Sequence, residues 1–162
     1  KDVHDVMPFD NKLILVEVTG KDLITMLEIG TSGAHGMLQM VGLEVVLHPE
    51  DLRDRDLNKD GQVENWEKTR LCKATVNGKA ISPRKSYSIV TSDFLLTGGD
   101  HLGPAFQNAR ILKDGPTLRE SIQSYIKATT RSEGGTDKEF KCLVNPQELT
   151  ERSIRYDSCR LR

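Results

Sequence analysis

Residues 91–106 read Thr91-Ser-Asp-Phe-Leu-Leu-Thr-Gly-Gly-Asp-His-Leu-Gly-Pro-Ala-Phe106 and carry the most informative pattern in the chain. A run rich in β-branched residues, Tyr87 to Thr91, leads into this stretch and predicts a strand that ends shortly before Phe94. Asp100 lies six residues after Phe94, and the pair Gly98-Gly99 directly precedes it. We therefore expect the end of this strand to hold an aromatic face and an anion close together.

An aromatic ring beside a carboxylate suits a ligand with a flat part and a polyhydroxyl part. A planar heterocycle can stack on Phe94 while vicinal sugar hydroxyls donate hydrogen bonds to Asp100, and nucleosides contain both parts. Gly98 and Gly99 would belong to this site because positive φ and close approach of a ligand both exclude a Cβ atom. The same residues also fit a strand end, a core phenylalanine and an ordinary glycine turn.

Length and composition limit the class of protein. The 162 residues suit a single domain with one core, and 36% hydrophobic and 29% charged content predicts loops and an exposed tail. The formal net charge of −1 gives no excess of basic residues for contacts with phosphate groups, so nucleic-acid binding is not expected. No apolar run approaches the ~20 residues that a membrane span requires. The start, Lys1-Asp-Val-His4, is no basic and apolar leader, so we expect it to lie inside a longer protein.

The three cysteines, Cys72, Cys142 and Cys159, lack the spacing of metal ligands. An odd number leaves at least one thiol free or paired with another chain. A bridge between Cys142 and Cys159 would suit an oxidising compartment, but the sequence does not decide the pairing.

Apolar periodicity predicts an α+β fold, with a mixed β-sheet and two main helices. Strands are expected over residues 12–18, 37–47, 71–76 and 86–91, and Asn77-Gly78 predicts a tight reversal between the last two. One helix is expected from Thr19 to a glycine end at Gly30 and Gly33, and another from Pro116-Thr117 onward. This domain covers residues 1–130 with a polar insert at 50–68, and residues 131–162 form a linker and polar tail.

The insert contains a calcium-loop pattern, Asp56-Leu-Asn-Lys-Asp-Gly-Gln-Val-Glu-Asn-Trp-Glu67. It matches the twelve-residue EF-hand loop at every position, with alternate side chains pointing into a tight turn that Gly61 permits. Glu64 would act through a water molecule, and Val63 would face inward as a small apolar anchor. The predicted Ca²⁺ ligands are Asp56, Asn58, Asp60, the backbone carbonyl of Gln62 and both carboxylate oxygens of Glu67.

This single loop without long flanking helices indicates a structural ion, because calcium sensors carry such loops in pairs. A divalent ion would neutralise clustered carboxylates and so order a long insertion. The alternative is an acidic surface loop that water alone solvates.

Five sequence blocks follow one another in an order that is typical of a known family. They are Met7-Pro-Phe-Asp-Asn11, Leu15-Val-Glu-Val-Thr-Gly-Lys-Asp-Leu23, Leu38-Gln-Met-Val-Gly42, Val76-Asn-Gly-Lys-Ala-Ile81 and Tyr87-Ser-Ile-Val-Thr-Ser-Asp-Phe-Leu-Leu-Thr-Gly-Gly-Asp100. Together they resemble the C-terminal domain of the 5′-nucleotidase and UDP-sugar hydrolase family, over roughly residues 3–128. The calcium loop lies between the third and fourth blocks, in a variable connection.

The resemblance implies a division of labour between two domains. An N-terminal metallophosphoesterase domain with two divalent metals hydrolyses the phosphate ester, and the C-terminal domain holds the base and ribose and carries the substrate to the metals by rotation. Phe94 matches the family position that stacks on the base, and Asp100 matches the one that accepts hydrogen bonds from ribose. Members are exported, so a periplasmic, cell-surface or secreted location is expected.

The chain departs from the family pattern in three places. Met37 stands where members usually place a second aromatic residue against the base, and a thioether packs on a ring less selectively. His101-Leu-Gly-Pro104 changes the rim of the glycine loop, where His101 would lie. The family's arginine segment that grips the substrate should precede Lys1.

Catalytic chemistry is expected elsewhere than in these 162 residues. A dinuclear phosphatase needs clustered His, Asp and Asn ligands, whereas His4, His35, His48 and His101 are scattered. We therefore predict a non-catalytic nucleotide-recognition domain of a larger phosphoesterase. The alternative is a non-catalytic, calcium-binding structural or interaction module that retains the fold without the ligand.

Overall fold

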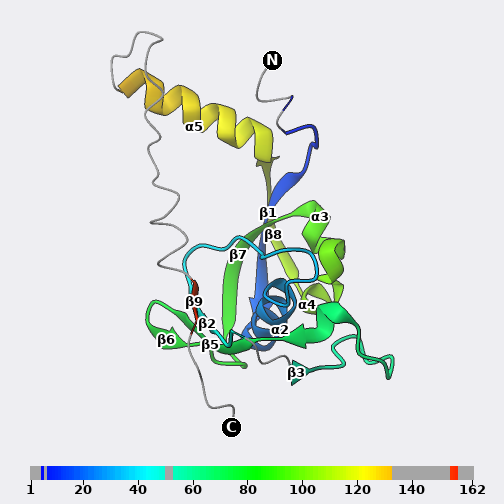
Figure 1. The fold of residues 1–162 in the computed structure, drawn as a ribbon. Coiled ribbons are helices and arrows are strands. Elements are labelled where there is room, and N and C mark those ends of the chain that lie inside the picture. Colours follow the sequence, from blue (N-terminus) through cyan, green and yellow to red (C-terminus); the bar gives the residue numbers. More distant parts are fainter. Residues whose placement is uncertain (1–4, 6, 50–52, 133–153, 157–162) are drawn as a thin grey trace.

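The computed structural model describes residue 5 and residues 7–49, 53–132 and 154–156 (Figure 1). Strands β1, β7 and β8 stand at the centre of the molecule, and helix α2 packs against β1 and β7. A second group of strands, β2, β5 and β6, lies at the lower side in this view, and helix α5 extends away from the upper end of β8. This is the α+β class that the sequence predicts, with the mixed sheet divided into smaller sheets.

The central sheet is antiparallel and has the order β7-β1-β8, from Ser86–Ser92, Lys12–Thr19 and Arg110–Thr117. Alternate residues of β1, namely Ile14, Val16 and Val18, are buried. This alternation is what a strand with one face on the core requires. Tyr87 lies opposite Val18, and Thr91 lies opposite Ile14, so β7 delivers its end to the same side of the sheet as the start of β1.

The second sheet has the order β6-β5-β2-β9, from Lys79–Ala80, Leu71–Val76, Glu44–Leu47 and Ile154–Tyr156. Asn77 and Gly78 both have positive φ and form the tight reversal between β5 and β6. Strands β2 and β9 run parallel. A small third sheet pairs β3, Arg53–Asp54, with β4, Lys68–Thr69, and so closes the base of the predicted calcium loop.

Helix α2, Gly20–Gly30, supplies one side of the core through Leu23, Met26 and Leu27. Thr19 caps its start in a capping box, because its hydroxyl accepts from the Asp22 N–H. The other helices are α5, Leu118–Ser132, and two single turns, α3, Asp93–Leu96, and α4, Gly103–Phe106. Short 3₁₀ turns η1, Asn65–Glu67, and η2, Gly99–His101, precede β4 and α4.

The expected elements need four corrections. The strand predicted over 37–47 covers only Glu44–Leu47, and residues 37–43 are irregular. The Asn77-Gly78 reversal joins β5 to the short β6, since β7 pairs with β1 in the other sheet. Strand β8 was not expected, because Gly115 and Pro116 interrupt its pattern. Of the predicted linker and tail, the structure describes only residues 131–132 and 154–156. The first two belong to the end of α5, and the other three form β9.

Candidate nucleoside site and calcium loop

Phe94 lies in the single-turn helix α3, directly after β7. Ser92 caps this turn by accepting a hydrogen bond from the Leu95 N–H. The side chain of Phe94 is 48% exposed, so its ring is not part of the core. An ideal Cβ at Gly99 would lie 2.5 Å from Phe94 Cε1, which shows that the ring rests directly on the Gly99 backbone.

The glycine loop that follows has an unusual backbone. Gly98 has φ 104°, and Asp100 and His101 have φ 54° and 61°, so two non-glycine residues adopt the left-handed region. Gly99 is absent from the residues with positive φ. Position 98 thus has the positive φ that the glycine pair was expected to need, whereas at position 99 the close approach is that of the Phe94 ring.

Asp100 opens onto a pocket of about 150 Å³ that Met37 also lines. Its carboxylate is exposed and makes no hydrogen bond or ion pair with another described residue. Other lining residues come from the end of α2, from residues 35–39 and from Leu102. The fold thus brings Met37 and Asp100 to one pocket, and Phe94 lies next to it on the backbone of Gly99 without lining it.

A second, apolar groove of about 320 Å³ adjoins this pocket and shares Leu38, Gln39 and Leu102 with it. Val41, which is 78% exposed, and Leu95 of α3 also line the groove. The irregular segment 37–43 therefore separates the two hollows.

Two histidines and the tryptophan form a ring stack that the sequence analysis did not find. The His101 ring is stacked on Trp66, with 4.9 Å between ring centroids and an angle of 3° between planes. On the pocket side, His101 meets the His35 ring at 4.7 Å with a tilt of 39°. The position of His101 beside Asp100 predicts that it lies at the pocket rim, but no sequence pattern indicates either of its ring partners.

The calcium-loop residues are gathered by hydrogen bonds within the loop. The Asp60 N–H donates to Asp56 Oδ1 at 3.1 Å and to Asn58 Oδ1 at 2.9 Å. The Gly61 N–H donates to Asp56 Oδ2 at 3.1 Å, and Gly61 has φ 84°. Positions one, three and five of the pattern therefore face one another around a sharp turn, as the spacing predicts.

Glu67 reaches back to the start of the loop from η1. Its Oε1 accepts hydrogen bonds from the N–H groups of Leu57 at 2.7 Å and Asn58 at 3.1 Å, and its Oε2 accepts from the Glu64 N–H at 3.1 Å. The residue is fully buried. The carboxylate predicted to close the calcium site thus already joins the two ends of the loop. Val63 is 40% exposed, so the inward anchor predicted at this position is wrong.

Glu64 and Glu67 interact as a pair. A hydrogen bond with Glu67 raises the pKa of Glu64, and burial and the Asp60 charge act in the same direction. Burial would raise the pKa of Glu67, but hydrogen bonds from Glu64 and from backbone N–H groups outweigh it and lower that pKa. Glu64 Oε2 is buried without a hydrogen-bond partner among the described residues.

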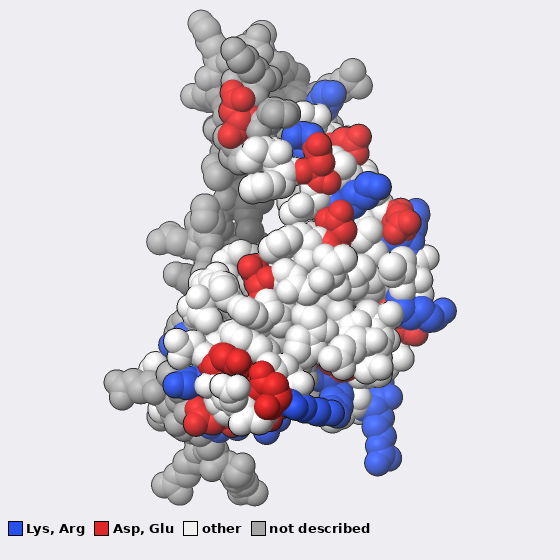
Figure 2. Space-filling model, turned by 90° about the vertical axis from the view of Figure 1, so that its right-hand side faces the viewer, with Lys and Arg blue, Asp and Glu red and all other residues white. Residues whose placement is uncertain are grey.

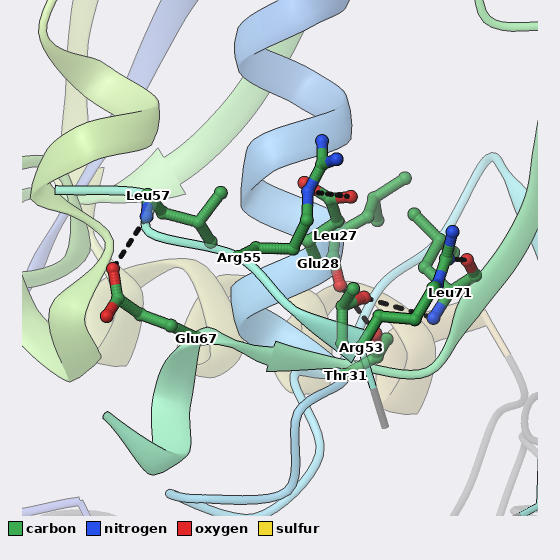
Figure 3. A network of polar contacts seen from close by, with 9 residues as sticks. Leu27, Glu28, Thr31, Arg53, Arg55, Leu57, Glu67 and Leu71 are labelled. Carbon is green, nitrogen blue, oxygen red and sulfur yellow. Dashed lines mark hydrogen bonds and ion pairs between the residues drawn. The ribbon is translucent and has the colours of Figure 1, made fainter. Parts of the chain in front are cut away.

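The start of the loop is anchored to helix α2 (Figure 3). Arg55 Nε lies 3.5 Å from Oε1 of Glu28, which is buried, and the Arg55 N–H donates to the Glu67 carbonyl. Burial raises the pKa of Glu28, and the charges of Arg55 and Arg53 offset part of this effect. Arg53 also donates to the Leu71 carbonyl, which ties β3 to β5.

Charged side chains are distributed unevenly over the face shown in Figure 2. Asp and Glu gather at its lower end, the middle of the face is largely uncharged, and further Lys, Arg, Asp and Glu side chains lie along its upper part and right edge. Within residues 5, 7–49, 53–132 and 154–156, no group of three His, Cys, Asp or Glu side chains is arranged to hold a metal ion. Asp56, Asp60 and Glu67, the three carboxylates of the predicted calcium set, therefore do not form such a group in the described structure.

Two further findings concern the environment of the chain. No helix in the described part is long and apolar enough to cross a membrane. Cys72 is disulfide-bonded, and Cys142 and Cys159 lie outside the described residues.

The family model for the 5′-nucleotidase C-terminal domain matches residues 1–108. The chain belongs to this family. The match contains Met37, the predicted calcium loop, Phe94 and Asp100, so all the candidate residues lie within the family region. The sequence resemblance is therefore confirmed for the domain family.

Individual relatives agree with this assignment. The chain is 25% identical over 142 residues to the trifunctional nucleotide phosphoesterase protein YfkN of Bacillus subtilis, with 70% of the chain and 10% of YfkN covered. Its fold resembles a 5′-nucleotidase precursor from Thermus thermophilus, with a TM-score of 0.66, 19% identity, and 98% of this chain and 27% of that chain covered.

The NAD nucleotidase NadN of Haemophilus influenzae shares the fold with a TM-score of 0.55 and 13% identity. That match covers 96% of this chain and 26% of NadN. The chain thus spans about a tenth of the curated relative and under a third of these structures.

Proposed function

We propose that this chain is the nucleoside-recognition domain of a nucleotide phosphoesterase. The observation that carries the proposal is the exposed carboxylate of Asp100, which has no partner among the described residues and opens onto the pocket that Met37 lines. The exposed Phe94 ring rests on the neighbouring Gly99 backbone. The ring supplies the stacking face, Met37 packs on the other side of the base, and Asp100 accepts hydrogen bonds from the ribose hydroxyls. Gly98 and Gly99 shape the loop that presents them.

The reaction belongs to a partner domain in this proposal. A metallophosphoesterase domain with two divalent metals hydrolyses the phosphate ester, and this chain contributes no catalytic group. The names of YfkN and NadN, a nucleotide phosphoesterase and a nucleotidase, support a nucleotide as substrate. The disulfide at Cys72 supports an exported protein, in the periplasm, at the cell surface or secreted, because such bonds persist in oxidising compartments.

Calorimetric titration with adenosine and uridine tests the binding proposal. Phe94→Ala should weaken binding about two- to twelvefold, since an aromatic contact contributes about 0.5–1.5 kcal/mol beyond area burial. Asp100→Asn should weaken it about tenfold or more, because hydrogen bonds to a charged group contribute about 1.5–3 kcal/mol. The matched controls are Phe9→Ala and Asp114→Asn, which change an exposed phenylalanine and an exposed aspartate outside the pocket.

We also propose that the loop from Asp56 to Glu67 binds a structural Ca²⁺ ion. The proposal rests on the twelve-residue sequence pattern. It is supported by the oxygens of Asp56 and Asn58, which share the Asp60 N–H donor, and by Glu67, which reaches back to the Asn58 N–H at the start of the loop. The buried, unpartnered Oε2 of Glu64 would gain a water-bridged or direct cation contact. Calcium titration should therefore give a heat signal and a higher melting temperature.

The controls for calcium binding lie in the same loop. Asp60→Asn removes a predicted ligand charge and should weaken binding about tenfold or more, because Ca²⁺ affinity follows the number of charged ligands. Asp54→Asn changes an exposed carboxylate that lies just before the pattern and should leave binding unchanged. Equal melting temperatures in chelator and in millimolar calcium would exclude the ion.

A second candidate is a calcium-braced structural module that no longer binds a nucleoside. It is favoured by the pocket volume of about 150 Å³ and by Met37 in place of an aromatic residue. Ligand pockets usually have about 300–1,000 Å³. Equal adenosine affinity of the parent chain and Phe94→Ala would favour this second candidate.

A further inference from the structure

The predicted calcium loop and the candidate nucleoside pocket are joined by the ring stack. Trp66 is the residue before Glu67, the last ligand position of the loop, and its side chain is only 9% exposed. Its indole lies flat on His101, at 4.9 Å and 3°. His101 is the residue after Asp100, the proposed ribose ligand.

The stack continues to the opposite wall of the pocket. His101 meets His35 at 4.7 Å, and His35 lines the same pocket as Asp100 and Met37. One imidazole is therefore held between a residue of the calcium loop and a residue of the pocket wall. Stacked rings at these distances are favourable contacts, so a shift of Trp66 moves the position of lowest energy for His101.

The backbone at this point needs support from its surroundings. Asp100 and His101 both have positive φ, a conformation that residues other than glycine adopt only when neighbouring structure holds them. The Asp100 carboxylate has no described partner of its own. The ring stack on His101 is thus the side-chain contact that fixes the turn from which Asp100 projects.

We propose that Trp66 and His101 are positioning residues that make nucleoside binding at Asp100 depend on calcium in the loop. The inference rests on both parts of the proposed function. When the loop ligands close around the ion, Glu67 and its neighbour Trp66 are held in one place, and the stack then holds the Asp100-His101 turn in its binding conformation. Without the ion, the turn samples other conformations.

Linkage gives this proposal a measurable form. If calcium tightens nucleoside binding by some factor, the nucleoside must tighten calcium binding by the same factor. Couplings between two sites are commonly about 5- to 150-fold. Because one ring stack connects the two sites, we expect calcium to tighten nucleoside binding about tenfold and the nucleoside to tighten calcium binding by the same factor.

The test measures adenosine affinity by calorimetry in calcium and in chelator, for the parent chain and three variants. Trp66→Leu keeps an apolar side chain but removes the stack, and Trp66→Phe restores an aromatic face. His101→Asn removes the ring from an exposed residue and keeps a side chain that tolerates positive φ. Phe9→Leu, at an exposed phenylalanine, is the matched control.

A spectroscopic readout separates positioning from general stability. Trp66 is the single tryptophan of the chain, so its fluorescence reports on the stack alone. Adenosine should change this emission in the parent chain and leave it unchanged in His101→Asn, which still folds and binds calcium. Calcium should tighten adenosine binding about tenfold in the parent, Phe9→Leu and Trp66→Phe, and less than twofold in Trp66→Leu and His101→Asn.

The possible failures are distinct. If both ligands bind but calcium leaves adenosine affinity unchanged, or changes it equally in the parent and in His101→Asn, this inference is wrong and the proposed function stands. If adenosine binds neither in calcium nor in chelator, the proposed function and the inference fall together. If Trp66→Leu does not fold, His101→Asn alone decides between these results.

Discussion

Replacing Gly99 with alanine should displace the Phe94 ring without unfolding the domain. An ideal Cβ at this position lies 2.5 Å from Cε1 and 2.6 Å from Cζ of Phe94. Non-bonded carbon atoms come into contact at about 3.5–4.0 Å, so the ring must move by about 1 Å or more. It can do so into solvent because the side chain is 48% exposed, and the backbone at Gly99 does not need positive φ.

The displaced ring should cost binding and not stability. Loss of a well-placed stacking face removes about 0.5–1.5 kcal/mol, which weakens adenosine binding about two- to twelvefold. The urea midpoint should change little. Gly103→Ala is the matched control, since its Cβ would meet only the Gly98 Cα atom at an ordinary 3.7 Å. Unchanged adenosine affinity in Gly99→Ala, at unchanged stability, would show that the ring is not the stacking face.

Three further variants test the fold. Gly20→Ala should destabilise the domain by about 2 kcal/mol or more in urea titration, because its Cβ would lie 2.0 Å from the backbone oxygen of Ser82. Thr19→Ala should cost about 1 kcal/mol through the lost cap of α2, measured the same way. Burial raises the pKa of Glu28, so its contribution to stability is present below about pH 4.5 and is lost as pH rises. The parent should therefore lose stability relative to Glu28→Gln between pH 4 and 7, and a constant difference would contradict the assignment.

Elements with a clear periodicity were predictable, and β8 shows why others were not. β1 alternates strictly, and α2 has a capping box, so local pattern and final structure agree. In β8, Gly115 is required because a Cβ there would lie 2.7 Å from the Leu13 carbonyl oxygen of the neighbouring strand. Pro116 is tolerated because β8 is at the edge of its sheet. The need for Gly115 and the tolerance of Pro116 both depend on how β8 pairs with strands distant in sequence, so a local pattern does not predict them.

The candidate site shows the same limit. Phe94 and Asp100 are close in sequence, so their spacing predicted that they lie together, and the glycine loop supplied the reason. The contact of His101 with Trp66 joins residues 35 positions apart and has no periodic signature. For Gly99, the sequence indicated a close approach but not that the approaching group is the chain's own aromatic ring.

The insertion is connected to the domain more closely than a self-contained surface loop would be. A self-contained loop would be ordered by its internal contacts alone. These are the β3–β4 pair at its base and the hydrogen bonds that Glu67 accepts across it. Two of its side chains instead contact other elements: Arg55 pairs with Glu28 of α2, and Trp66 stacks on His101 of η2. The ends of α2 and η2 both contribute residues to the pocket, Ile29 and Asp100. Ordering the loop therefore acts on two walls of the pocket, and we expect Arg55→Ala to reduce any calcium effect on adenosine affinity less than His101→Asn does, because Ile29 offers the ligand no polar group.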